Sequence, residues 1–425
     1  MNTKMTRKLT VLIVPVGGIG HVNATIGIAE TLYSRGHRIV FAVDQSYKGR
    51  LIKRGFEEEI VSKPMTEEEV RDPSGYFIKR LEDMGVYGDY SPLDKLKFMA
   101  ESVIKLSSKE EDQILNEIIK RTKPDVILID FMFSPSIINS GIPWVNVVSI
   151  QILTVIDDPR TPPPWLGIAT NDNSEWRKYR DLSKVYVEKL KKNYYEIFEN
   201  GNPFPEDRLI ESPYLNIYSY PKELDYTDQR PLPPKWHQFD SFIRLKEEDF
   251  ELPEKLAQKT GKLIFLSLGS LGSANVNLMK RLLDLIADLP FRFIVAKGIY
   301  GDQYDLPDNC WGDKMVPQIK VLQKVDLVIT HGGNNTVTET FYFGKPMIIM
   351  PMFCDQFDNA QRIHEKGFGI RMNPHRCTRE ELSNAINKLV YDDDLVLRMK
   401  KISQRIQSEI KQGKVGELIE KLVID

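Results

Sequence analysis

One local pattern, an apolar strand followed by a glycine turn and a helix, occurs twice in the sequence and restricts the fold more than any other feature. The apolar run 9–16 leads into the glycines of residues 17–20 and then into a helical pattern. The run 263–268 leads in the same way into residues 269–272 and a second helical pattern. Apolar runs without polar alternation are typical of strands buried on both faces of a parallel sheet. The sequence therefore predicts an α/β fold with two Rossmann-like, doubly wound sheets that face each other across a cleft.

Chain length and a proline-rich interval predict the domain boundaries. A single core stops growing at roughly 250–300 residues, so a chain of 425 residues is expected to form two domains. The strand rhythm breaks between residues 157 and 236, which we interpret as the end of the first domain and the approach to a linker. The predicted parts are a first domain (1–240), a linker (241–260), a second domain (261–405) and a C-terminal helix (406–425) that could pack back on the first domain. Further strands are expected at residues 38–43, 126–130, 144–149, 291–296, 327–330 and 347–350.

The composition excludes several classes of protein. A formal net charge of −2 at pH 7 offers no broad positive field for a nucleic acid. No apolar run reaches the roughly 18 residues of a membrane span, and the N-terminus is unlike a signal peptide, so we expect a cytoplasmic protein with a mature N-terminus and no membrane anchor. Cys310, Cys354 and Cys377 lack the spacing of a disulfide framework or a zinc site, and we interpret them as small buried hydrophobic residues.

The strongest functional signal is a strand, residues 326–330, that runs into a glycine pair and the start of a helix (HGGNNT, residues 331–336). Ligands of open α/β sheets bind at the carboxyl ends of the strands. The free N–H groups and the positive dipole end of a helix start attract phosphate. Asparagine and threonine are also ordinary helix caps, and glycines also form ordinary turns, so this loop alone leaves both interpretations open.

The residues around this loop carry a family resemblance, which covers nearly the whole chain and is specific over about forty residues. The pattern resembles the donor-binding signature of the UDP-glycosyltransferases. That resemblance implies the GT-B fold, with an acceptor-binding first domain and a nucleotide-sugar-binding second domain. It also implies transfer of a sugar from a UDP-sugar to a small hydrophobic acceptor, with inversion at the anomeric carbon. The residues that carry it are Pro317-Gln318, His331-x-Gly333, Asn335-Thr336, Glu339, Gly344-x-Pro346, Pro351 and Asp355-Gln356.

Carried over residue by residue, the resemblance implies a division of the donor site. Residues 331–336 are expected to hold the diphosphate, Glu339 to receive the ribose hydroxyls, and Asp355 with Gln356 to bind the sugar. Hydrogen-bond donors suit phosphate oxygens, and a carboxylate suits a vicinal diol. The donor-binding residues predicted in this way are Gly20, Ser270, Met315, Val316, Gln318, His331, Gly333, Asn334, Asn335, Thr336, Glu339, Asp355 and Gln356.

Two positions depart from the family pattern. Met315 stands where the family commonly has a tryptophan that stacks on uracil, and Lys324 replaces a later histidine. Methionine can cover a base through its polarizable sulfur with less planar overlap, so a thymidine-linked donor is an open alternative. For the sugar we favour glucose, because Asp355 would repel a uronate and no arginine stands in the signature to offset it.

The first half of the chain offers a candidate base. His21 directly follows the glycine turn and Asp130 ends the predicted strand 126–130, so both are expected at the same edge of the cleft. They resemble the family's catalytic histidine and its aspartate partner, which implies that His21 deprotonates the acceptor hydroxyl and that Asp130 fixes its tautomer. We expect the helix start to bias the His21 imidazole towards its neutral form. A structural histidine and a helix N-cap before Ser134 are the alternative interpretations.

Aromatic residues in the first half predict an apolar acceptor pocket, although most of them are expected in the core. The candidates are Phe131, Phe133, Trp144 and Trp165. The expected partners are UDP-glucose or a related nucleotide sugar and a phenolic, flavonoid or xenobiotic acceptor. No cofactor and no metal are expected, because the pattern shows no carboxylate pair for a metal and the helix start can take the charge of the leaving diphosphate.

Three alternative functions stay open. The glycine turn after the first strand, with Asp44 at the end of the next strand, is also found in NAD-dependent dehydrogenases, although Asn23 replaces the third glycine. A UDP-sugar epimerase of the same fold would bind the nucleotide in the second domain, and a non-catalytic sensor would bind it without turnover. The combination of His21 with Asp130 favours transfer.

Overall fold

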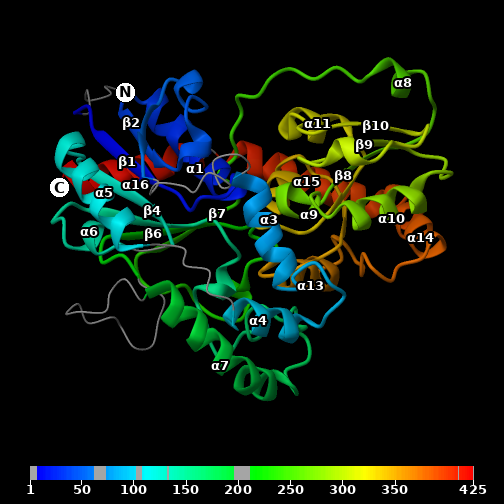
Figure 1. The fold of residues 1–425 in the computed structure, drawn as a ribbon, viewed down its shortest axis with the longest axis horizontal. Coiled ribbons are helices and arrows are strands. Elements are labelled where there is room, and N and C mark those ends of the chain that lie inside the picture. The colour runs from blue at the N-terminus through cyan, green and yellow to red at the C-terminus, as the bar shows by residue number, and fades with distance from the viewer. Residues whose placement is uncertain are drawn as a thin grey trace.

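Two parallel sheets form the frame of the molecule and lie next to each other along its long axis (Figure 1). The computed structural model describes residues 7–61, 73–101, 108–131, 134–195, 211–409 and 411–424. None of the helices in these ranges combines the length and the apolarity that a membrane crossing requires.

The first sheet has seven parallel strands, and its central strands consist mainly of Val, Ile and Leu and are buried on both faces. In spatial order the strands are β3 (Glu57–Ile60), β2 (Arg38–Val43), β1 (Thr10–Val14), β4 (Val126–Asp130), β5 (Trp144–Val148), β6 (Leu215–Ser219) and β7 (Trp236–Phe239). The helices of this half are α1 (Ile19–Ser34), α3 (Pro73–Asp83), α4 (Pro92–Glu101), α5 (Lys109–Thr122), α6 (Pro135–Ile138) and α7 (Trp176–Tyr195).

The second sheet has six parallel strands. In spatial order they are β10 (Cys310–Asp313), β9 (Arg292–Ala296), β8 (Leu263–Ser267), β11 (Leu327–Thr330), β12 (Met347–Ile349) and β13 (Gly369–Arg371). The helices are α8 (Glu254–Ala257), α9 (Gly269–Gly272), α10 (Val276–Ile286), α11 (Gln318–Lys324), α12 (Asn334–Tyr342), α13 (Gln356–Glu365), α14 (Arg379–Val390), α15 (Asp393–Ser408) and α16 (Lys411–Ile424). The prediction of two doubly wound α/β sheets is confirmed.

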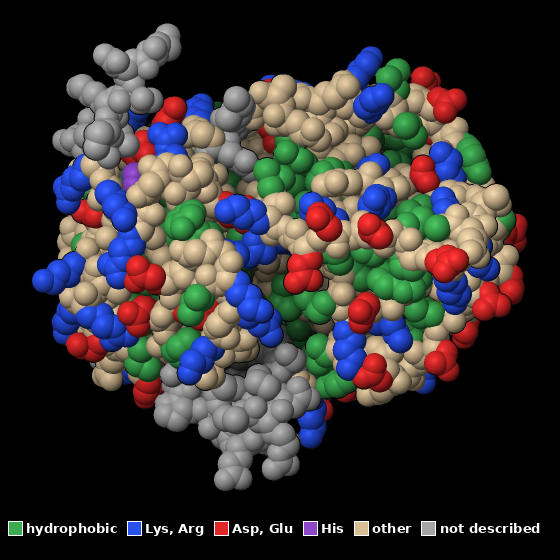
Figure 2. Space-filling model, turned by 90° about the horizontal axis from the view of Figure 1, so that it is seen from above, with side chains coloured by type: hydrophobic (Ala, Val, Ile, Leu, Met, Phe, Trp, Pro, Cys, Tyr) green, Lys and Arg blue, Asp and Glu red, His purple; other side chains and the backbone are tan. Residues whose placement is uncertain are grey.

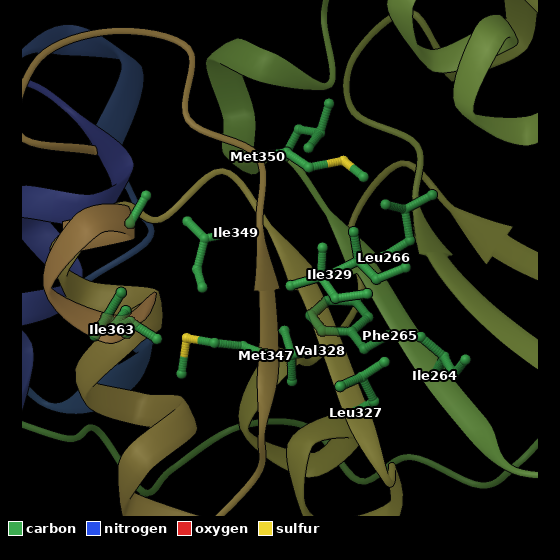
Figure 3. Packing of buried hydrophobic residues seen from close by; sticks show 14 of the residues in the cluster. Ile264, Phe265, Leu266, Leu327, Val328, Ile329, Met347, Ile349, Met350 and Ile363 are labelled. Carbon is green, nitrogen blue, oxygen red and sulfur yellow. The ribbon is translucent and has the colours of Figure 1, made fainter. Parts of the chain in front are cut away.

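Apolar packing holds the central strands of the second sheet together. Side chains of β8, β11 and β12 interdigitate, and Ile363 of α13 packs beside them (Figure 3). The same cluster of buried residues continues into the first half, where it includes Ile152, Tyr218 and Trp236. The apolar core is therefore continuous across the junction between the sheets.

The sequence did not predict all of the strands. β6 and β7 lie in or at the end of the interval 157–236, which we had interpreted as the end of the first domain. Proline-rich segments flank both strands and interrupt the pattern of apolar runs from which strands are predicted. β3 was missed as well, because three of its four residues are glutamates and its place at the edge of the sheet does not demand an apolar run.

Polar contacts of α13 join the two sheets. Arg362, which is 1% exposed, donates hydrogen bonds to the backbone oxygens of Leu224 and Asp225 at 2.8 Å each. Its guanidinium also lies over the ring of Tyr226, 4.5 Å from the centroid. A single buried side chain of the second half thus satisfies carbonyl groups that follow β6 of the first half.

The last helix returns to the first sheet. Val415 and Ile419 of α16 are fully buried in the cluster that also contains Val22 and Leu32 of α1. Glu420 accepts hydrogen bonds from Arg35 and His37, the closest at 2.7 Å.

Arg362→Met tests the contribution of this junction to stability. The substitution leaves buried carbonyl groups without donors, so we expect the free energy of unfolding to fall by roughly 3 kcal/mol or more. Urea unfolding followed by tryptophan fluorescence measures the change. Lys366→Met is the matched control, because Lys366 follows directly on α13 and its ammonium binds the carboxylate of the exposed Asp228. An equal fall in the free energy of unfolding for the two substitutions would contradict the contribution of Arg362 to the junction between the sheets.

Candidate functional site

His21 and Asp130 meet at the carboxyl edge of the first sheet. β1 and β4 are paired with Val14 opposite Ile129, so the residues that follow each strand emerge side by side. The His21 Nδ1 lies 2.9 Å from Asp130 Oδ2. Gly18 permits this arrangement, because a Cβ at that position would lie 2.9 Å from the His21 ring. α1 begins at Ile19, within the glycine turn, and His21 lies in its first turn.

Ser149, which the sequence analysis did not select, completes this group. Its Oγ lies 2.6 Å from His21 Nδ1 and 2.8 Å from Asp130 Oδ2. The Ser149 backbone N–H also donates to Asp130 Oδ1 at 3.2 Å. When His21 Nδ1 carries its proton, the serine can accept from the histidine and donate to the aspartate. The position directly after β5 is the signal that could have identified Ser149.

The charge of Asp130 controls the titration of His21. Burial lowers the pKa of His21, but the neighbouring carboxylate and its hydrogen bond outweigh burial, and Asp355 adds to their effect. The pKa is therefore raised above its ordinary value. The prediction that the helix start biases the imidazole towards its neutral form is wrong. A pKa above the ordinary value makes His21 a stronger base.

The aromatic candidates of the first half lie in different environments. The ring of Phe131 is 5.7 Å from the ring of His21, centroid to centroid. Trp144 is 3% exposed, lies at the amino end of β5 and packs in the core under α5 and α6, so it does not belong to the edge that holds His21. The backbone N–H of Trp165 donates to Asp358 at 2.7 Å. Phe133 lies outside the described residues.

The start of α12 faces the same junction from the second sheet. Gly332 has a φ of 87°, and a Cβ there would lie 2.5 Å from Ile349, so the turn into the helix requires glycine. No side chain caps the start of α12. Its first backbone N–H groups and its dipole therefore form a site suited to an anion.

Asn334, the first residue of α12, links the two sheets. Its carboxamide donates to the backbone oxygens of Ser149 at 3.2 Å and Ser219 at 3.0 Å. The asparagine is 4% exposed. Its side chain points to the first half rather than to the front of the helix start. Asn334 therefore connects the start of α12 directly to the group formed by His21, Asp130 and Ser149.

Glu339 is held by donors from three segments. Gln318 Nε2 lies 2.5 Å from one carboxylate oxygen, and Asn335 Nδ2 lies 2.8 Å from the other. Arg244, from the predicted linker, forms a buried ion pair with the same carboxylate and a second pair with Glu247 at 2.7 Å. The sequence analysis did not select Arg244, because its contact depends on how the linker folds back on the second half.

His331 is half-buried and lies against glycines. A Cβ on Gly269 would lie 2.7 Å from its ring, and a Cβ on Gly333 would lie 2.5 Å from Nε2. Burial lowers the pKa of His331 to about 4, against a hydrogen bond to the backbone of Ser267 that raises it. The imidazole is therefore neutral at pH 7 and can donate a single N–H to a ligand.

Asp355 and Gln356, which follow β12, accept hydrogen bonds from backbone N–H groups of the first and the second half, respectively. Asp355 accepts the backbone N–H of Gln151 at 2.9 Å, and burial raises the pKa of Asp355. Gln356 Oε1 accepts the N–H groups of Met352 at 2.9 Å and Phe353 at 3.2 Å. Both side chains thus shape the loop in which they lie.

The remaining predicted donor residues lie closer to solvent. Met315 is 68% exposed, which leaves its side chain available to cover a planar ligand. Gly20 and Ser270 are exposed, whereas Val316 and Gln318 are half-buried.

Comparison with known proteins identifies the second half directly. Residues 256–405 match the family described as UDP-glucoronosyl and UDP-glucosyl transferase. A relative from Bacillus licheniformis, NDP-glycosyltransferase YjiC, is 24% identical and aligns over 93% of this chain and 91% of its own length. Demethyllactenocin mycarosyltransferase from Streptomyces fradiae is 23% identical over 93% of this chain and 81% of its own length.

Solved structures show the same fold. Spinosyn forosaminyltransferase SpnP superposes with a TM-score of 0.67 at 17% identity, covering 99% of this chain and 100% of its own. The glycosyltransferase VinC, solved in complex with DTDP, gives a TM-score of 0.64 at 16% identity, covering 97% of this chain and all of its own. These likenesses identify the two-sheet arrangement as the GT-B fold.

The pKa of His21 provides a test of the site before any activity is measured. NMR titration of the imidazole should give a pKa above 6.5 in the wild type. In Asp130→Asn the attracting charge is lost and burial remains, so the pKa should fall below 6.5. Asp125→Asn, at the opposite end of β4, should leave it unchanged. A wild-type pKa at or below 6.5 is incompatible with the geometry.

Proposed function

We propose that the chain is a member of the UDP-glycosyltransferase family that uses a nucleotide sugar, because residues 256–405 match that family and glycosyltransferases align over most of the chain. It transfers a hexose from a UDP-sugar to a hydroxyl group of a small hydrophobic acceptor, with inversion. One observation carries the proposal: Asn334, at the start of the helix suited to the diphosphate, hydrogen-bonds Ser149, whose hydroxyl contacts His21 and Asp130. The base and the anion site therefore face the same small volume.

His21 acts as the general base. Its Nε2 accepts the proton of the acceptor hydroxyl, and the oxygen attacks the anomeric carbon from the face opposite the diphosphate. Asp130 stabilises the imidazolium that forms, in the way that it already raises the pKa of His21. Ser149 shares the Nδ1 proton and keeps the ring in one orientation. Attack from the opposite face inverts the configuration at the anomeric carbon.

The second half holds the donor. The start of α12, with His331, Asn335 and Thr336, binds the diphosphate and takes up the charge that develops as it leaves. Glu339 receives the ribose hydroxyls, while Gln318 and Arg244 keep its carboxylate in place. Asp355 and Gln356 bind the sugar. We propose that transfer proceeds without a metal ion.

Residues expected around the base and the sugar support the proposed donor. Met315 covers the base, and UDP is the proposed nucleotide. The competing choice is a thymidine donor, which is supported by the fold neighbour solved with DTDP. For the sugar we propose glucose, because the buried Asp355 disfavours a second negative charge nearby.

The acceptor is proposed to be a phenolic, flavonoid or xenobiotic compound. Phe131 supplies an apolar surface beside His21, and Trp165 packs against the hydrophobic cluster formed by α4 and α7. Trp144 is not part of this proposal, because it lies in the core.

His21→Ala tests the base. We expect the rate of transfer to fall by at least about 10²-fold, because the transition state loses its general base. UDP affinity, measured by calorimetry, should change less than about twofold, since His21 lies in the other half of the molecule. His364→Ala, at an exposed histidine of α13, serves as the control. Unchanged transfer by the His21 variant would rule out this mechanism.

Thr336→Ala tests the diphosphate site. Loss of one hydrogen bond to a charged ligand should raise the Kd for UDP roughly tenfold, equivalent to about 1.4 kcal/mol. The control is Thr338→Ala, whose hydroxyl already donates to the backbone of Asn335 within the helix. If both variants bind UDP as the wild type does, the diphosphate lies elsewhere.

A further inference from the structure

A cavity of about 300 Å³ lies beside the loop of residues 350–356, and His21 is not among the residues that line it. The segment 89–95, at the start of α4, forms one side of it. Pro351, Phe357 and the segment 371–376 after β13 form the other side. The volume lies at the lower end of the range for small-molecule sites, roughly 300–1,000 Å³.

Lys95 is the central feature of this cavity. It is 3% exposed, and its ammonium donates to the backbone oxygen of Met352 at 2.6 Å. Among the described residues, no carboxylate oxygen lies within 4.0 Å of this ammonium. The ring of Phe357 lies 5.9 Å away and gives it a partial counter-charge. An ammonium has three N–H donors, so a buried lysine with one carbonyl partner is incompletely satisfied.

The other charged groups of the lining leave a positive excess. Arg371 donates to two neutral oxygens of described residues, those of Gly167 at 2.8 Å and Gln361 at 2.9 Å. Arg376 pairs with Asp89 at 2.6 Å, and Asp89 is the only carboxylate among the lining residues.

A histidine adds a further unsatisfied group to the same wall. His375 Nε2 is buried and has no hydrogen-bond partner among the described residues. Within the part of the chain that the structure describes, two cations with no carboxylate oxygen within 4.0 Å and one unsatisfied imidazole nitrogen therefore line one small volume.

We propose that this cavity binds the carboxylate or phosphate group of a small anionic ligand. The anion accepts hydrogen bonds from Lys95 and supplies the counter-charge that this buried ammonium lacks. The start of α4 lies on the same wall and favours negative charge in the same place. Since Lys95 also holds the carbonyl of Met352, the ligand lies against the loop that carries Asp355 and Gln356.

The experiment measures binding of two anions to the full-length protein. Calorimetry with inorganic phosphate and, separately, with benzoate should detect binding to the wild type, and benzyl alcohol should not bind at this site. Binding of phosphate alone identifies a phosphate ligand, and binding of benzoate identifies an organic acid. Lys95→Met should weaken binding at least tenfold.

Two further variants make the result specific. Lys95→Gln keeps a donor for the Met352 carbonyl but removes the charge, so it should lose the anion while preserving the loop. Lys97→Met changes a lysine of the same helix that does not line the cavity, and it should bind as the wild type does. Lack of binding of both anions to the wild type overturns the proposal. Equal affinity in the wild type and in Lys95→Gln overturns it as well.

Discussion

The hydrogen bonds from Asn334 to the ends of β5 and β6 are the contact on which the rest of the site depends. The base lies in one sheet and the anion site in the other, so neither is complete without the junction. Asn334 fixes the start of α12 against Ser149, and Ser149 in turn contacts His21 and Asp130. A buried amide NH2 group that donates to two backbone oxygens sets both the distance and the orientation of the two halves, which apolar packing alone does not define.

Charged groups reinforce this junction by using backbone partners. Asp355 and Asp358 accept backbone N–H groups of the first half, and Arg362 donates to its carbonyl oxygens. Buried charges are tolerated when their hydrogen bonds are satisfied. Burial nevertheless raises the pKa of Asp358 to about 7. The junction therefore combines a continuous apolar core with polar contacts that specify how the two halves meet.

Short sequence patterns predicted those parts of the fold that depend on residues close together in the chain. The buried strands and the helix start at residue 334 follow from apolar runs and glycines, and His21 and Asp130 follow from strand ends. Contacts between distant segments could not be predicted in this way. Arg244 and Lys95 acquire their partners, Glu339 and the carbonyl of Met352, only when segments far apart in the sequence dock. The neutral bias expected for His21 was wrong because the charge of Asp130, at 2.9 Å, exceeds the effects of burial.

Transfer of a sugar between two bound molecules is the central claim, and mass spectrometry of the reaction tests it most directly. The protein is incubated with UDP-glucose, UDP-glucuronate, UDP-N-acetylglucosamine or TDP-glucose, with and without a panel of phenols and flavonoids. The account predicts an acceptor that gains one hexosyl unit from UDP-glucose, with release of UDP that depends on the acceptor. Conversion of the nucleotide sugar to an isomer without any acceptor, or no glycosylated product with any donor, would contradict it.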